Sequence, residues 1–223
     1  MNSLFKEFAE SALLVVGALL PIVNPLGGAP IFLTLTNGLS HQGRVRLSRS
    51  IALNGLALIV ASIFIGTHVL GFFGISLPVV QVGGGLLVVA TGWTLLRRPA
   101  DEVGDDGVPN SCNEANFMRQ AFYPLTLPLT VGPGSISVAI TVGANRPEGA
   151  EWRWPVIAGL LIGAAAVAAS IYLCNRFAER IAQVLGDTGM NVALRLSSFI
   201  LLCIGVQIAW NGLSSLLRSV LVR

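Results

Sequence analysis

Long runs of apolar residues, separated by short polar stretches, dominate the pattern along this chain of 223 residues. A helix that crosses a bilayer needs about 20 consecutive, mostly apolar residues. Six runs reach this length, and each predicts a membrane-spanning segment. The six predicted segments cover residues 8–36, 47–70, 78–96, 117–142, 154–174 and 196–217.

The stretches between these runs predict the connections. A short apolar turn at 71–77 joins the second segment to the third, and the remaining connections are 37–46, 97–116, 143–153 and 175–195. The stretch 97–116 combines acidic residues with glycines and prolines, which is typical of a solvated linker.

The first run is interrupted near its middle by the sequence P-I-V-N-P-L-G-G-A-P at residues 21–30. Proline lacks an N–H and clashes with the preceding helical turn, and glycine is the poorest ordinary helix former. Broken backbone at membrane depth is tolerated only where it is buried in protein or lines a water-filled cavity. The interruption therefore predicts a broken helix and a candidate site.

The same pattern recurs in the fourth run as P-L-T-L-P-L-T-V-G-P at residues 124–133. Three prolines and one leucine match at an offset of 103 residues. Weaker glycine and alanine matches relate the second segment to the fifth at an offset of 108. The third segment is related to the sixth at an offset of 120, through Gly85 and Gly205 and through Gly92 and Gly212.

An odd number of spans in each half inserts the second half upside down. The repeat therefore predicts two inverted three-helix repeats, residues 1–110 and 111–223, within one all-α membrane domain. Two interrupted helices at matching positions of inverted halves are the sequence signature of a secondary transporter with a site near the midplane.

Composition agrees with a membrane class: 53% of the residues are hydrophobic and 11% are charged, against about 25% charged in soluble domains. The expected partner is the lipid bilayer, and the absence of a basic stripe excludes nucleic-acid binding. Basic residues in short loops favour the cytoplasmic side. They are more numerous after the first, third and fifth segments, at Arg44, Arg46, Arg49, Arg97, Arg98, Arg119, Arg176, Arg180 and Arg195. Both termini are therefore predicted outside the cytoplasm.

The two interruptions predict the chemistry of the site. Pro30 and Pro133 suit the first turn of a new half-helix, whose free N–H groups and positive dipole end attract a carboxylate. The predicted substrate-binding residues are Asn24, Pro25, Gly27, Gly28, Thr126, Thr130, Gly132, Gly134 and Ser135. Each polar side chain also has a local alternative, because hydroxyls bond their own helix and Asn24 can cap exposed backbone.

A sodium ion near Asn24 and Thr130 is also compatible with the oxygen atoms available there. No acidic residue lies deep in any predicted span, so a buried carboxylate proton relay is not indicated. The coupling ion is predicted as Na⁺ or H⁺, with Na⁺ favoured. No nucleophile–base pair, metal-ligand spacing or phosphate-binding loop appears, so the chain is not predicted to be an enzyme or to hold a metal or cofactor.

Polar residues within the other spans have two interpretations. Asn54, Gln81, Gln207 and Asn211 could line a pathway or pack between helices, and packing is the favoured interpretation for each. Gly83, Gly84 and Gly85 lie inside an apolar run and predict close helix packing.

With the strings N-P-x-G-x-x-P-I-F at 24–32 and P-L-T-V-G-P-G at 128–134, the chain resembles the MarC family of six-helix inner-membrane proteins of bacteria and archaea. The resemblance covers essentially the whole chain. That family is also grouped as small neutral amino acid transporters. The resemblance implies transport of amino acids such as glycine and alanine, coupled to a cation gradient, in a bacterial inner membrane.

Two further hypotheses remain beside a transporter that works by alternating access. The first is an exporter or channel for another small solute, and the second is a membrane scaffold or regulatory protein without flux. The direction of transport and assembly into a homo-oligomer are left open by these patterns.

Overall fold

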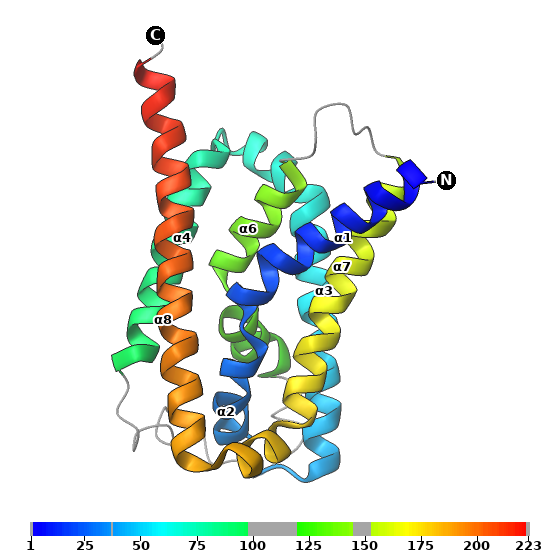
Figure 1. The fold of residues 1–223 in the computed structure, drawn as a ribbon, viewed down its shortest axis with the longest axis vertical. Helices are drawn as coiled ribbons and strands as arrows, with labels where there is room; N and C mark the ends of the chain where they lie inside the picture. Colours follow the sequence, from blue (N-terminus) through cyan, green and yellow to red (C-terminus); the bar gives the residue numbers. More distant parts are fainter. Residues whose placement is uncertain (1, 37, 98–119, 145–152, 222–223) are drawn as a thin grey trace.

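The structure, a computed structural model, describes residues 2–36, 38–97, 120–144 and 153–221 (Figure 1). The described chain is helical and contains no strand, which confirms the predicted all-α class. Its elements are α1 (Asn2–Val23), α2 (Pro25–Leu35), α3 (His41–Phe72), α4 (Leu77–Arg97), η2 (Ala121–Thr130), α6 (Pro133–Ala144), α7 (Trp154–Arg176) and α8 (Ala178–Leu221).

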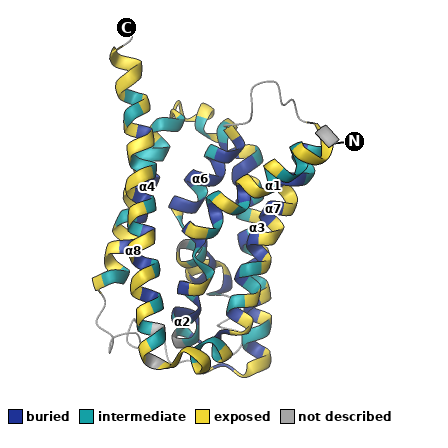
Figure 2. Cartoon of the chain, in the orientation of Figure 1, coloured by how far each residue is buried: buried dark blue, intermediate teal, exposed yellow. Residues whose placement is uncertain are grey.

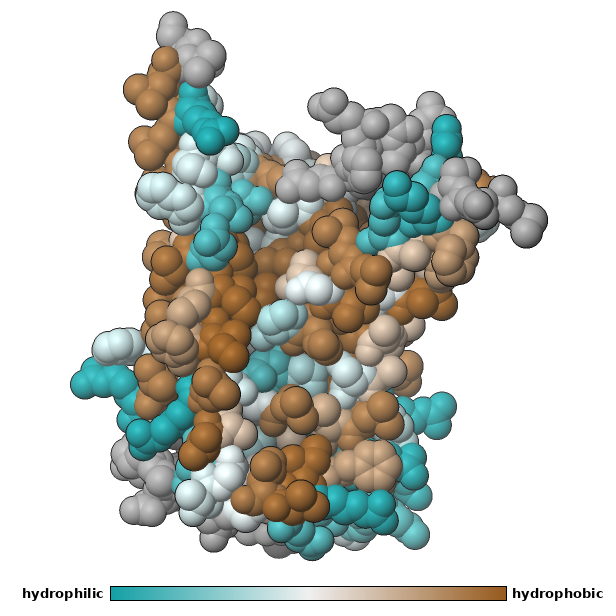
Figure 3. All heavy atoms as spheres, in the orientation of Figure 1, coloured by the Kyte–Doolittle hydropathy of each residue, from teal (hydrophilic) through white to brown (hydrophobic). Residues whose placement is uncertain are grey.

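Among the described residues, 5 helical segments are long and apolar enough to cross a membrane: Leu4–Leu33, His41–Phe72, Leu77–Arg97, Trp154–Arg176 and Asn191–Leu221. They coincide with five of the six predicted segments. The predicted segment 117–142 is divided between η2 and the short apolar helix α6, and its residues 117–119 lie outside the described residues. The visible face carries a hydrophobic middle with hydrophilic residues toward both ends (Figure 3).

The two broken segments run in opposite directions (Figure 1). α1 begins beside the N-terminus at the upper end of the molecule, and α2 continues toward the lower end. α6 instead rises from the middle to the upper end. α3 and α8 run upward, whereas α4 and α7 run downward.

The predicted connection 175–195 lies between two candidate spans, although the second span begins earlier, at Asn191, and most of the connection is helical. α7 extends to Arg176, and α8 begins at Ala178 with Gly186 as its non-helical residue, at φ 61°. Glycine adopts this backbone conformation without steric penalty. Glu179 anchors this part of α8 to the start of α3 by an ion pair with Arg44 and lies 3.5 Å from His41 Nδ1.

α4 and α8 pack closely through glycines. A Cβ added to Gly205 would lie 2.6 Å from the Val89 nitrogen and 2.9 Å from the Gly85 oxygen, and one added to Gly85 would meet the Ala209 nitrogen and the Gly205 oxygen. The two glycines therefore face each other, with the same neighbours on each side. Close packing is confirmed for Gly84 and Gly85, whereas Gly83 faces open space.

Two more glycines repeat this contact above and below. Gly92 faces the backbone of Ser198 and Leu202, and Gly212 faces Pro78 and Val82. Gly92 and Gly212 differ by 120 residues, and so do their neighbours: Ser198 corresponds to Pro78, and Leu202 corresponds to Val82. The 120-residue offset, a weak sequence match by itself, therefore also relates the two sides of the α4–α8 contact, because residues that differ by this offset have equivalent neighbours.

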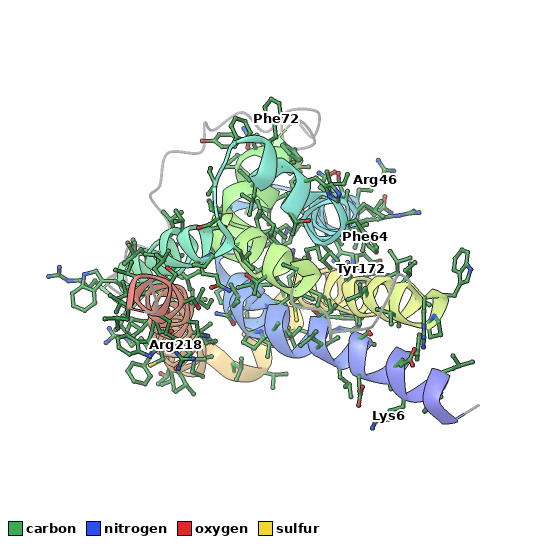
Figure 4. The ribbon with its side chains drawn as sticks, turned by 90° about the horizontal axis from the view of Figure 1, so that it is seen from above. Lys6, Arg46, Phe64, Phe72, Tyr172 and Arg218 are labelled. Carbon is green, nitrogen blue, oxygen red and sulfur yellow. The ribbon has the colours of Figure 1, made fainter. Side chains whose placement is uncertain are left out.

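The helices form two groups. α4 and α8 pair along their length, while α1 packs on α7 and α3 packs on both α6 and α7. Contacts of α4 with α6 and of α8 with α2 join the groups. Seen from above, α8 with Arg218 and α1 with Lys6 lie at opposite edges of the molecule (Figure 4). α6, between the groups, is largely buried (Figure 2).

Candidate functional site

The first break is a single residue. Asn24 lies between α1 and α2 with φ 46°, a left-handed conformation that asparagine adopts more readily than most residues. Its side-chain Oδ1 accepts a hydrogen bond from the Gly27 N–H at 3.2 Å, and its carbonyl accepts one from the Gly28 N–H at 3.0 Å. Asn24 thus ends one helix and caps the next.

This cap corrects one expectation. α2 begins at Pro25, so the prediction that Pro30 starts the half-helix is wrong, and Pro30 lies inside α2. Pro25 still occupies the first helical position, where a missing N–H has no cost. A proline does mark the start of this half-helix, but it is Pro25 and not Pro30.

We expect Asn24→Ala to lower the free energy of unfolding by about 1–2 kcal/mol, because alanine can neither cap α2 nor adopt a positive φ without strain. Asn24→Gly also removes the cap, but glycine adopts a positive φ without strain. Its loss of unfolding free energy should therefore be clearly smaller than that of Asn24→Ala. Thermal unfolding of the two variants in detergent measures the difference. Equal losses would show that the left-handed backbone contributes nothing.

The second break is longer. η2 contains non-helical backbone at Tyr123 and Leu127, and the Val131 N–H donates to the carbonyl of Thr126 at 2.8 Å. Thr126 Oγ1 donates to the carbonyl of Ala121 at 2.6 Å, and Thr130 Oγ1 donates to that of Leu125 at 2.7 Å. Threonine hydroxyls therefore add hydrogen bonds to the carbonyls of the irregular helix, as neighbouring polar groups do in broken membrane helices.

The tip of α6 follows directly. α6 begins at Pro133, as predicted, and the Ile136 N–H donates to the Gly132 carbonyl at 3.1 Å. The N–H groups of Gly134 and Ser135 belong to the first turn, where a helix supplies no partner of its own. Both residues are buried, and a Cβ on Gly134 would run into the side chain of Val88.

A cavity of about 460 Å³ lies at the two breaks. It is lined by eight of the predicted binding residues: Asn24, Pro25, Gly27, Gly28, Thr130, Gly132, Gly134 and Ser135. Thr126 is not among them, because its side chain is fully buried on the Ala121 carbonyl. The repeat motifs, 103 residues apart in sequence, thus form one cavity.

One wall of the cavity was not predicted. α4 contributes Leu87, Ala90, Thr91 and Thr94, all exposed, and α7 contributes the buried Asn175. Threonines three residues apart in an apolar span would have been the signal for the α4 wall, because this spacing places them on one helix face.

The cavity extends from the breaks toward one end of the molecule. Thr94 and Asn175 lie close to Arg97 and Arg176, the last residues of α4 and α7. From α1 only Ile22 and Val23 contribute, both beside the break. The lining therefore reaches toward the arginine-rich end of the chain.

On the opposite side of the breaks, α6 packs tightly. A Cβ on Gly143 would meet the backbone of Ile63, and one on Gly66 would meet the side chain of Ile140. Ser137 Oγ also donates to the Val80 carbonyl at 3.0 Å, which joins α6 to α4. These contacts hold α6 against α3 and α4 on that side of the breaks.

The lining carries no charged side chain among the described residues. Its polarity comes from helix ends: α1 ends at Val23, so its last carbonyls face the break, whereas the first N–H groups of α6 face it from the other side. A helix carries a partial negative charge at its C-terminus and a partial positive charge at its N-terminus. The cavity therefore presents both polarities without an ionised residue.

The model of the MarC family of integral membrane proteins matches residues 9–217. The inner membrane protein MarC of Salmonella typhimurium is 30% identical over 98% of this chain and 99% of its own length. The corresponding protein of Citrobacter koseri is 30% identical over the same shares, and a membrane protein of Buchnera aphidicola is 28% identical over 92% of each chain. No solved structure matches with statistical significance. The chain belongs to the MarC family.

Proposed function

We propose that this MarC family protein is a secondary transporter of small neutral amino acids, of the glycine and alanine class, in the bacterial inner membrane. The inner-membrane location follows the names of the relatives. The observation that carries the proposal is the uncharged cavity between the C-terminal end of α1 and the N-terminal end of α6.

A zwitterion fits this arrangement. Its carboxylate would accept hydrogen bonds from the Gly134 and Ser135 N–H groups at the tip of α6. Its ammonium group would face the last carbonyls of α1, where Pro25 cannot supply the N–H that the Pro21 carbonyl would otherwise accept. A charged side chain on the substrate would find no counter-charge, which favours neutral amino acids.

Alternating access would follow from inverted repeats. The opposed directions of α1–α2 and of η2–α6, and the 120-residue correspondence between α4 and α8, support six spans arranged as two inverted halves. A cavity open toward one end then corresponds to one of two conformations, with the second opening toward the other end. With the arginine-rich end cytoplasmic, both termini would lie outside the cytoplasm.

The driving ion is proposed as Na⁺ or H⁺, with Na⁺ favoured. Thr130 lines the cavity, and its hydroxyl oxygen retains lone pairs while it donates to the Leu125 carbonyl. The Asn24 Oδ1 is already bonded to Gly27 but has a second lone pair. These oxygens are the ligand type that a hard cation prefers.

Uptake of labelled glycine and alanine into proteoliposomes tests the proposal, under an imposed Na⁺ gradient and, separately, a H⁺ gradient. We expect saturable uptake with one of the gradients, and exchange against unlabelled substrate inside the vesicles. Counterflow would separate a carrier from a channel. Absence of both uptake and exchange under either gradient would overturn transport of this substrate class and favour the scaffold hypothesis.

A further inference from the structure

Two polar side chains on α8 have no role in the conformation described. Gln207 and Asn211 are exposed within an apolar span, and their side chains bond each other, with Gln207 Nε2 donating to Asn211 Oδ1 at 2.9 Å. Polar side chains inside membrane spans are costly and mark pathways, relays or interhelical contacts. The space-filling view shows hydrophilic atoms on the upper half of α8, beside the hollow that separates it from α1 (Figure 3).

The 120-residue correspondence between α4 and α8 gives each of these two residues a counterpart on α4. The reciprocal contacts of Gly85 with Gly205, and of Gly92 and Gly212 with the facing backbones, all obey the 120-residue offset. By this offset Gln207 corresponds to Leu87 and Asn211 to Thr91. Both counterparts line the cavity.

The correspondence can be followed along the rest of this face. The other α4 residues in the cavity wall are Val88, Ala90, Thr94 and Leu95, and they correspond to Ile208, Trp210, Ser214 and Ser215 of α8. The exposed α4 residues Leu86 and Trp93 are absent from the wall, and their counterparts Val206 and Leu213 are apolar. The polar face of α8 therefore has the angular position that the cavity-lining face has on α4.

We infer that the face of α8 formed by Gln207, Asn211 and Ser214 lines a water-filled path from the breaks to the opposite end of the molecule in the second conformation. This inference rests on the proposed alternating access and names the residues of its second half-path. The amide groups would offer hydrogen bonds to water and to the polar ends of a zwitterion passing between α8 and α1.

A different explanation is contact between two copies of the chain, because amide side chains also join membrane helices. The structure favours the path, since the offset that relates equivalent positions of α4 and α8 gives this face the place on α8 that the cavity-lining face has on α4. A contact between copies would have no reason to follow that correspondence.

Thiol labelling tests the inference without any substrate. Single cysteines replace Gln207 and Asn211, in a chain that also carries Cys112→Ala, Cys174→Ala and Cys203→Ala, reconstituted into lipid nanodiscs. A charged methanethiosulfonate reagent modifies only thiols that reach water, because the thiolate is the reactive form. Val206→Cys and Leu213→Cys are matched controls, since they flank the test residues in depth on another face of α8.

We expect Gln207→Cys and Asn211→Cys to react several-fold faster than both controls, as Thr91→Cys should relative to Leu86→Cys in the described cavity. Equal rates at Asn211→Cys and Leu213→Cys would mean that depth alone sets access and would overturn the inference. Disulfide-linked dimers through Asn211→Cys would overturn it in favour of a contact between copies. Absence of glycine and alanine uptake would overturn the proposed substrate class but would leave this labelling pattern unchanged.

Discussion

Replacing Gly85 by leucine is expected to lower the free energy of unfolding by about 3 kcal/mol, the upper part of the usual cost of overpacking. The atoms that a Cβ would meet at this position are the backbone nitrogen of Ala209 and the backbone oxygen of Gly205. Backbone atoms cannot rotate away as a side chain can. The whole of α8 would have to move from α4, along the longest helix contact of the fold.

Gly83→Leu is the matched control. Gly83 lies two residues away in the same helix, is exposed, and has no atom within 4 Å of an added Cβ. Gly83→Leu also replaces a glycine of α4 by leucine, but it does so without the clash that is expected at Gly85. Thermal unfolding and the yield of monodisperse protein in detergent should separate the two variants, and similar losses in both would show that α4 and α8 do not depend on this contact.

The reciprocal variant extends the argument to the repeat. Gly205 faces Val89 and Gly85 as Gly85 faces Ala209 and Gly205. If the two helices are related as inverted copies, Gly205→Leu should cost about as much as Gly85→Leu. A large difference between them would indicate that the reciprocal geometry is not matched in energy.

The spans and both breaks could be predicted because their signals are local. Apolar runs of sufficient length predict membrane helices, and prolines beside glycines interrupt them whatever surrounds them. The meeting of the two breaks was also predicted, because the repeated motif indicated two inverted halves whose interruptions approach each other. Eight of the predicted binding residues therefore lie around one cavity.

The start of α2 could not be predicted in the same way. It depends on Asn24 adopting φ 46° and folding its own side chain onto Gly27. Two prolines five residues apart both suit a helix start, and the choice between them depends on that cap. Thr126 is a similar case, since its hydroxyl is used by the Ala121 carbonyl instead of facing the cavity.

The rotation of α4 is a tertiary property. Thr91 and Thr94 line the cavity because Gly85 and Gly92 hold the adjoining face of α4 against α8. The helix in 178–185 was missed for a different reason: it is too short for a span, and its ion pair between Glu179 and Arg44 joins residues far apart in the sequence. Contacts between distant parts of the chain decide both features.

Gly28→Leu is expected to abolish substrate binding while the fold is kept. Gly28 lines the cavity within α2, and an added Cβ meets no atom within 4 Å, so the leucine side chain would occupy the space of the substrate. We expect affinity for the transported amino acid to fall by about a hundredfold or more, equivalent to about 2.7 kcal/mol. Stability should instead rise by about 0.7 kcal/mol, because leucine is a better helix former than glycine.

Gly17→Leu separates the two effects. Gly17 is exposed in α1, outside the cavity lining, and also has open space around an added Cβ. It should gain the same helix propensity and keep full affinity. Calorimetric titration with the transported amino acid, together with thermal unfolding, measures both quantities in each variant. Full affinity in Gly28→Leu would place the substrate elsewhere, whereas a loss of stability would mean that α2 needs the bare backbone of Gly28 for packing and not for a ligand.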